Sequence, residues 1–266
     1  MSARRLALNG AAGIALAYIL MPLAFVTWLA FFRQEIPSFP PEGYSLRWFA
    51  AILDQPKFVE GFRMSFQVGV LATALGLVLG VPAALAVVRG RFRLRPTLAQ
   101  LLMMPLIVPG VVLGTAMYVF EVEAENGLDV DVLGTFYALV AGHTVIVIPW
   151  VVRLVTASLA GVDRSIEEAA QNLGANAFVT FRRITLPAIR PGIVAGGLFA
   201  FVTSFGNLEM SLFLVGPGRT TLPIVVLQYL EWKIDPTIAA VSVVQILLIA
   251  IAMLITDRYV KLARVV

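Results

Sequence analysis

The chain has 266 residues, of which 59% are hydrophobic and only 14% are charged. Soluble domains are typically about 45–50% apolar and about 25% charged, so a lipid bilayer must solvate part of this chain. The sequence has no Cys and a single His, His143, which excludes a disulfide framework, thiol chemistry and any metal motif that needs Cys or two His. The net charge of +4 falls in short loops between apolar runs, which indicates membrane topology rather than nucleic-acid binding.

Six apolar runs are long enough, or nearly so, to cross a bilayer at about 20 residues each. In chain order they are Leu8–Phe32, Phe66–Val88, Leu98–Phe120, Leu133–Val155, Ile193–Leu214 and Ile238–Ile255. The first run follows two arginines, as in a signal peptide, but it is too long and no small-residue cleavage site follows it. The sequence therefore predicts an all-α integral membrane protein with six transmembrane helices, in one transmembrane domain over residues 1–266.

The Lys and Arg residues set the predicted orientation. With the N-terminus in the cytoplasm, 14 of the 20 lie on the inner side, including all four arginines of the loop "RGRFRLRP". The loop "EVEAENGLDVD" carries five acids and no base, and it is predicted to lie outside. We expect both termini in the cytoplasm. The acidic outer loops could attract a cationic solute, or acids could simply remain where bases are excluded.

Glycine and proline recur inside the runs. Pro22, Pro82, Pro105, Pro109 and Pro149 predict kinks of the kind that membrane helices tolerate. A G-x-x-x-G pair in the second run, at residues 76 and 80, predicts the close approach of another helix.

One polar segment interrupts the second half of the chain, "SIEEAAQNLGANAF" from Ser165 onwards. Ser165 with Glu168 three residues later fits a capping box, which predicts that a helix begins there. Residues 166, 169, 170 and 173 are spaced to form one apolar face. Gly174 is placed to end the helix in a left-handed conformation.

A second short helix should follow this turn. Asn176 is positioned to cap it, and Pro187 and Pro191 are expected to end it before the next membrane run. The first helix carries small residues on its apolar face, where membrane-surface helices use large anchors. The pattern favours a helix that inserts into a groove of another protein over one that lies on the membrane.

The same residues resemble a known signature. Glu168, Ala169 and Ala170, then Gly174, then Ile184, Leu186 and Pro187 fit the pattern EAA---G---------I-LP in full. This is the signature loop of the membrane subunits of bacterial binding-protein-dependent ABC importers. The stretch "LFLVGPGRTTLP" and the "GH" before "VIPW" resemble the spermidine/putrescine branch, and most of all its C-type permease.

The resemblance implies the type I importer (MetI-like) fold, with the cytoplasmic coupling loop at about residues 157–190. It assigns ATPase coupling to the seven signature residues. It also implies two copies of an ABC ATPase subunit, a second permease subunit that is usually a different chain, a periplasmic solute-binding protein, and a place in the bacterial inner membrane.

The chain shows no catalytic set and no ATP-binding motif, since none of its three lysines follows a G-x-x-x-x-G. We therefore expect no enzyme activity, no cofactor and no metal in this subunit, with ATP bound by its partner. The alternative is a secondary transporter or channel that works without an ATPase, against which the signature loop argues.

Candidate solute-contacting residues interrupt the fifth run. They are Ser204, Asn207, Glu209 and Ser211. A charged residue at the centre of a membrane helix costs about 2.5–3.5 kcal/mol, so Glu209 should face water or a partner. C-type polyamine permeases tend to carry an acidic pair where this chain has Gly206 and Asn207, which favours a less cationic solute. His143, in the fourth run, is expected to pack between helices rather than bind solute.

Overall fold

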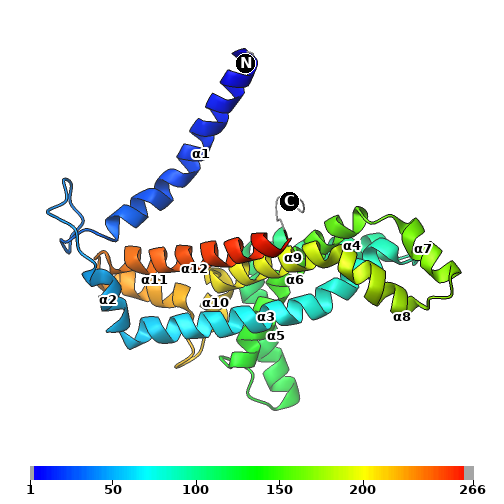
Figure 1. Cartoon of the computed structure of the whole chain (residues 1–266). Helices are drawn as coiled ribbons and strands as arrows, with labels where there is room; N and C mark the ends of the chain where they lie inside the picture. Colours follow the sequence, from blue (N-terminus) through cyan, green and yellow to red (C-terminus); the bar gives the residue numbers. More distant parts are fainter. Residues whose placement is uncertain (1–2, 261–266) are drawn as a thin grey trace. The chain divides into compact units, whose positions relative to one another are not determined.

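Within residues 3–260, which the computed structural model describes, every regular element is a helix (Figure 1). The long helices are α1 (Ala3–Leu29), α3 (Pro56–Arg89), α6 (Phe136–Ala160), α9 (Leu186–Phe205) and α12 (Thr237–Val260). The shorter ones are α2 (Arg47–Leu53), α4 (Arg95–Met103), the 3-10 helix η1 (Met104–Leu106), α5 (Gly110–Leu128), α7 (Arg164–Asn172), α8 (Ala177–Thr180), the π-helix η2 (Phe181–Thr185), α10 (Leu208–Leu214) and α11 (Leu222–Trp232).

Five helical stretches of the described chain are long and apolar enough to cross a membrane. A sixth span results if α4 and η1 are counted together with α5, from which they are bent by 105°. The structure thus supports an all-helical membrane protein with five to six spans. Each span has a counterpart among the six predicted runs, although two of those runs are broken.

The described chain divides into two compact units. Residues 60–225 and 251–260 form one, whose apolar core lies between α3, α6, α9 and α10 and includes Val68, Val147, Ile189 and Met210. Residues 3–59 and 226–250 form the other, in which Trp48 packs among small residues of α12 and donates a hydrogen bond from Nε1 to the Phe32 carbonyl at 2.6 Å. The single domain over residues 1–266 remains a prediction.

The predicted close helix contact forms between α3 and α6. A Cβ on Gly76 would lie 2.8 Å from Val147 Cγ2, and one on Gly80 would lie 2.8 Å from Val151 Cγ1. Since real Cβ atoms do not approach so closely, only glycine lets the two helices meet at these points.

The third predicted run is not one straight helix. It breaks between Met104 and Pro109, where two prolines and a 3-10 turn interrupt the α-helical hydrogen bonds. The prediction that "EVEAENGLDVD" is a loop is also partly wrong, because α5 continues to Leu128.

The fifth predicted run breaks as well, at Gly206 and Asn207, so that Leu208–Leu214 is the separate helix α10. The prediction that Pro187 and Pro191 end a helix is wrong. Pro187 lies in the first turn of α9, where a helix accepts proline, and Pro191 lies inside α9. Neighbouring groups can satisfy the backbone that a proline frees in a membrane helix.

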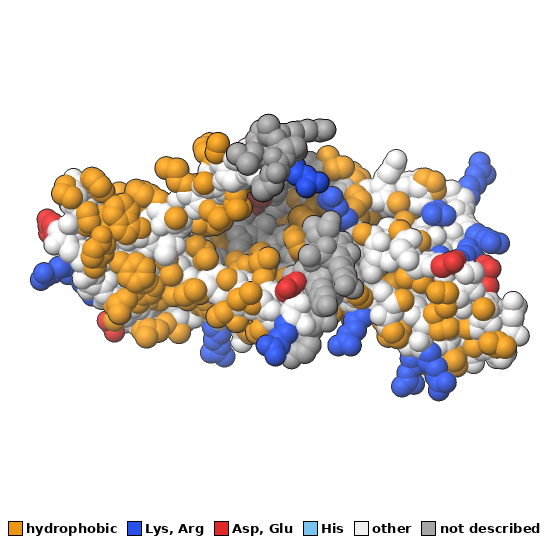
Figure 2. Space-filling model, turned by 45° about the horizontal axis from the view of Figure 1, so that its top comes forward, with side chains coloured by type: hydrophobic (Ala, Val, Ile, Leu, Met, Phe, Trp, Pro, Cys, Tyr) orange, Lys and Arg blue, Asp and Glu red, His pale blue; other side chains and the backbone are white. Residues whose placement is uncertain are grey.

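Hydrophobic side chains cover broad areas of the face shown in Figure 2. On α1, Ile14 is 74% exposed and Tyr18 is 78% exposed. Exposed apolar surface of this extent needs lipid or a partner protein around it.

Candidate functional site

The predicted coupling segment forms α7, α8 and the turn between them, and in Figure 1 it projects beyond the ends of α3 and α9. The N-cap of α7 is Asp163, whose Oδ1 accepts a hydrogen bond from the Ser165 backbone N–H at 2.9 Å. The predicted capping box at Ser165 is therefore wrong: the N-cap acceptor is Asp163, two residues earlier. The bonds from the Ser165 backbone and hydroxyl, with a smaller contribution from the charge of Arg89, hold the pKa of Asp163 below its usual range.

The turn after α7 matches the prediction. Gly174 has φ +91°, its N–H bonds to the Gln171 carbonyl at 2.9 Å, and the Ala175 N–H bonds to the Ala170 carbonyl at 3.0 Å. This pair of bonds is the Schellman motif, which requires a residue free to adopt positive φ. Asn176 then caps α8 as predicted, because its Oδ1 accepts from the Val179 N–H at 2.9 Å.

The outward side of this segment is left uncovered by residues 3–260. Ile166 is 53% exposed, Leu173 is 90% exposed and Phe178 is 68% exposed. Glu168 and Ala169 are exposed on the same helix, while Ala170 is half-buried. An exposed apolar surface of this kind fits a groove of another protein.

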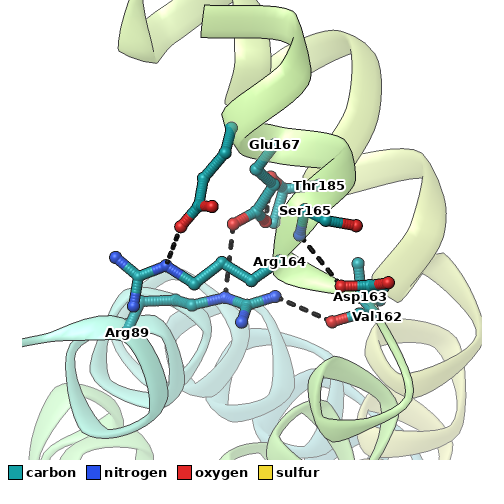
Figure 3. A network of polar contacts seen from close by, with 8 residues as sticks. Arg89, Val162, Asp163, Arg164, Ser165, Glu167 and Thr185 are labelled. Carbon is teal, nitrogen blue, oxygen red and sulfur yellow. Dashed lines mark hydrogen bonds and ion pairs between the residues drawn. The ribbon is translucent and has the colours of Figure 1, made fainter.

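A polar network joins the inner side of α7 to other helices (Figure 3). Arg89, the last residue of α3, forms an ion pair from Nε to Glu167 Oε2 at 3.4 Å and donates from Nη2 to the Val162 carbonyl at 3.1 Å. Thr185, the last residue of η2, donates to Glu167 Oε1 at 2.8 Å. Glu167 is therefore held from two sides. We call Arg89, Glu167, Thr185 and the Val162 carbonyl the α7 clasp.

A second polar group lies at the break between α9 and α10. His143 on α6 is buried, with Nδ1 2.8 Å from Ser204 Oγ and Nε2 3.2 Å from Ser211 Oγ. The Ser211 hydroxyl donates to the Asn207 carbonyl at 2.8 Å, and Asn207 Oδ1 caps α10 through the Met210 N–H at 2.8 Å. One assignment satisfies every group: Nε2–H donates to Ser211, and Nδ1 accepts from Ser204.

Three of the predicted solute-contacting residues, Ser204, Asn207 and Ser211, have a structural role in this network. Ser204 and Ser211 are buried, and Asn207 is half-buried at the cap. Together with His143 they hold the backbone where the membrane helix is interrupted, which is a site that would otherwise leave unpaired polar groups in an apolar region. A contact of these residues with solute remains a prediction.

Glu209 lies apart from that network and is exposed. Its carboxylate occupies the space that a side chain on Gly110 would fill, so it rests against the first residue of α5. A Cβ on Gly114, one turn further, would lie 2.6 Å from Phe213 Cδ2 of α10, so α5 and α10 lie close together there. The N-terminus of a helix favours a negative charge, and Pro109 provides no side-chain cap there. The fold thus holds an exposed carboxylate at a helix break.

The remaining signature residues lie on the other side of the turn. Ile184 is half-buried within η2, Leu186 is half-buried as the first residue of α9, and Pro187 is exposed beside it. The sequence analysis missed Arg89, Glu167 and Thr185. The sequence did contain a signal for Glu167: it is adjacent to Glu168, and two adjacent residues of a helix point to different sides. If Glu168 faces outward, Glu167 must face another part of the chain.

Comparison with known families finds a match over residues 76–264 to the family described as binding-protein-dependent transport system inner membrane component. The putrescine transport system permease protein PotI of Escherichia coli (strain K12) is 32% identical over 201 residues, covering 75% of this chain and 72% of the relative. The spermidine/putrescine transport system permease protein PotC of the same strain is 25% identical over 217 residues, covering 82% and 80%.

Solved structures show the same fold. A chain of the MetNI methionine ABC transporter in an inward-facing conformation superposes with a TM-score of 0.64 at 20% identity, covering 77% of this chain and 94% of that one.

Proposed function

We propose that this chain, which belongs to the family of binding-protein-dependent transport system inner membrane components, moves small cationic solutes of the polyamine type across the inner membrane. The chain is a permease subunit of an ABC importer, and ATP is hydrolysed by a separate ATPase in such transporters. Such permeases assemble with an ATPase and a binding protein and carry no cofactor.

Gly206 and Asn207 stand where C-type polyamine permeases tend to carry an acidic pair, which argues for a less cationic solute, but two observations support an amine. PotI is named for putrescine, and PotC for spermidine and putrescine. In this chain, Glu209 offers an exposed carboxylate at the break between α9 and α10, where a membrane protein would otherwise keep an apolar side chain. A cationic amine is the natural ligand for such a group.

The assembly that we propose contains two ATPase copies and a second permease of different sequence. One permease with five to six spans provides one side of a pathway, and the exposed apolar side chains of this chain provide surface for a second. Measuring the mass of the purified complex tests this arrangement. A homodimeric permease pair would contradict the heteromeric proposal.

We also propose that α7 is the coupling helix, with Glu168, Ala169, Ala170 and Gly174 at the ATPase surface. Its exposed outward side supports this role. Ile184, Leu186 and Pro187 would connect the loop to α9, in which Leu186 and Pro187 form the first turn.

The solute is tested with the complex in proteoliposomes, using its own binding protein. Uptake and ATP hydrolysis are measured with putrescine, spermidine, a neutral sugar and molybdate. We expect stimulation by the two amines alone. Stimulation by the sugar or the oxyanion, with none by an amine, would refute the assignment.

Glu209→Gln then tests the carboxylate, because it keeps the shape and removes the charge. We expect the putrescine concentration for half-maximal uptake to rise by about tenfold or more, the equivalent of one charge-assisted hydrogen bond. Glu123→Gln, at an exposed position of α5, is the matched control and should leave uptake unchanged. If Glu209→Gln lowers the yield of complex without changing the concentration dependence, Glu209 instead pairs with a base on the second permease.

A further inference from the structure

We infer that Arg89 is a positioning residue of the transport cycle, which makes α7 move together with α3, α6 and α9 through the α7 clasp. This inference rests on the proposed coupling role of α7 and adds residues outside the signature. A helix that is displaced by the ATPase can move the membrane helices only if side-chain contacts connect it to them.

The contacts of α7 show which side chains provide that tie. Its two ion pairs differ: Arg164 and Glu168, 3.2 Å apart, both belong to α7 and lie largely in the open. Arg89 and Glu167 come from different helices, and their side chains are 23% and 12% exposed. The half-buried Arg89–Glu167 pair is less screened by water than the exposed one. Arg89 Nε makes an ion pair but no hydrogen bond with Glu167, while Arg89 is hydrogen-bonded to Val162 and Glu167 to Thr185.

Two groups of the clasp, the Arg89 guanidinium and the Glu167 carboxylate, each hold two partners. The Arg89 guanidinium reaches Glu167 and the carbonyl of Val162, which follows α6. The Glu167 carboxylate reaches Arg89 with one oxygen and the Thr185 hydroxyl with the other. The planar fork of arginine suits such a double contact, which a lysine ammonium does not reproduce. The ends of α3 and η2 therefore meet on the Glu167 side chain, and Arg89 ties Val162, which follows α6, to the same group.

The π-helix η2 supports the same interpretation. It spans Phe181–Thr185 and ends on the residue that donates to Glu167. A π turn is uncommon and shifts the register of the helix that precedes it, and such turns occur frequently at functional sites. Here it aims Thr185 at α7 while α9 continues without interruption to Phe205.

The test compares the whole complex carrying Arg89→Gln, Glu167→Gln, both changes together, or Thr185→Val. Arg93→Gln, at an exposed arginine of the same loop, is the charge-matched control. Spin labels at Gln171→Cys and Arg91→Cys report the separation of α7 from the end of α3, and this chain has no native Cys. Pulsed EPR distances are recorded without nucleotide and after trapping with ATP and vanadate, so that no solute is needed.

With the clasp intact, we expect one narrow distance in both states. In Arg89→Gln and Glu167→Gln the trapped state should broaden and shift, and putrescine uptake per ATP hydrolysed should fall about tenfold. The effect of the double variant should be smaller than the sum of the two single effects, because both changes remove the Arg89–Glu167 contact. Basal ATP hydrolysis and the yield of complex should stay at the control level.

Unchanged distances and unchanged coupling would overturn the inference, as would single effects that add in the double variant. If the charge variants fail to assemble, Thr185→Val provides the test. Unchanged distances between the spin labels in Thr185→Val would also overturn the inference, because the network would then have only a structural role. A photo-crosslinker at Leu173 separates this from the proposed coupling role. If the photo-crosslinker at Leu173 forms no crosslink to the ATPase in the complex with an intact clasp, the proposed coupling role is refuted. If that crosslink forms but the clasp variants show unchanged distances and coupling, only the inference about the clasp is refuted.

Discussion

Gly174 offers the sharpest test of the coupling loop, because the structure separates two effects of a substitution there. Its φ of +91° lies in the region that L-residues avoid, yet a Cβ at this position would meet nothing within 4 Å. Gly174→Ala therefore adds backbone strain without a clash. A left-handed conformation costs an L-residue about 1–2 kcal/mol, which shifts the population of the native turn by a factor of about 5–30.

Gly174→Asp adds a negative charge to the same strain, at an exposed place beside the proposed ATPase surface. We expect normal membrane insertion for both variants, reduced coupling in Gly174→Ala, and loss of transport and of solute-stimulated ATP hydrolysis in Gly174→Asp. The matched control is Gly161→Ala, because Gly161 ends α6 at φ −80° and its Cβ would have an ordinary contact of 3.5 Å with the Ser158 carbonyl.

The assay is uptake per ATP hydrolysed in proteoliposomes, together with crosslinking of Leu173 to the ATPase. Full transport in Gly174→Asp would refute the assignment of α7 as the coupling helix. Equal losses in the Gly174 and Gly161 variants would show that strain at this turn is not the cause.

Asn126→Cys should be labelled only from outside the cell, since it lies in the acidic segment that the charge distribution places there; labelling from the cytoplasm alone would reverse the topology. His143→Ala should lower the free energy of unfolding by about 2–4 kcal/mol, because it leaves a cavity and two buried hydroxyls without their partner; an unchanged melting temperature in detergent would contradict the network. Gly80→Ala should cost about 1–3 kcal/mol from its contact with α6, which the same melting experiment measures. Burial raises the pKa of Asp235, but hydrogen bonds outweigh it and hold that pKa below its usual value of 3.8, and the bond and charge of Asp235 raise the pKa of Lys233 above 10.5. The stability that ionised Asp235 contributes is lost only as pH falls through its lowered pKa, and the stability that charged Lys233 contributes is lost only as pH rises through its raised pKa. Both groups stay charged between pH 5 and pH 9. The difference in melting temperature between wild type and Asp235→Asn should therefore be the same at these two pH values.

The sequence by itself determined the membrane class, the six apolar runs and the turn at Gly174. These follow from local chemistry: about 20 apolar residues match a bilayer, and a glycine after a short amphipathic helix has one common use. The cap at Asn176 was predictable for the same reason, since its bond reaches only three residues along the chain.

The N-cap of α7 shows the limit of local reasoning. Ser165 and Asp163 are both good N-cap residues, and the pattern of the sequence favoured the capping box. Asp163 is the N-cap because its Oδ1 accepts the hydrogen bond of the Ser165 N–H, and Glu168, the acid that a capping box at Ser165 needs, pairs with Arg164 instead. Both alternatives are local, so the sequence pattern alone does not decide between the two acceptors.

The separate helix α10 and the α7 clasp were decided by tertiary structure. Asn207 and Glu209 show in the sequence that the fifth apolar run is interrupted, but not that α9 ends and α10 begins there; the break is held by His143, which lies over 60 residues earlier. Likewise, Glu167 and Glu168 are equivalent by composition, and only the packing of α3 and η2 against α7 gives one of them buried partners. A hydrogen bond or ion pair between distant segments depends on how helices pack, and helix packing depends on side chains from the whole chain.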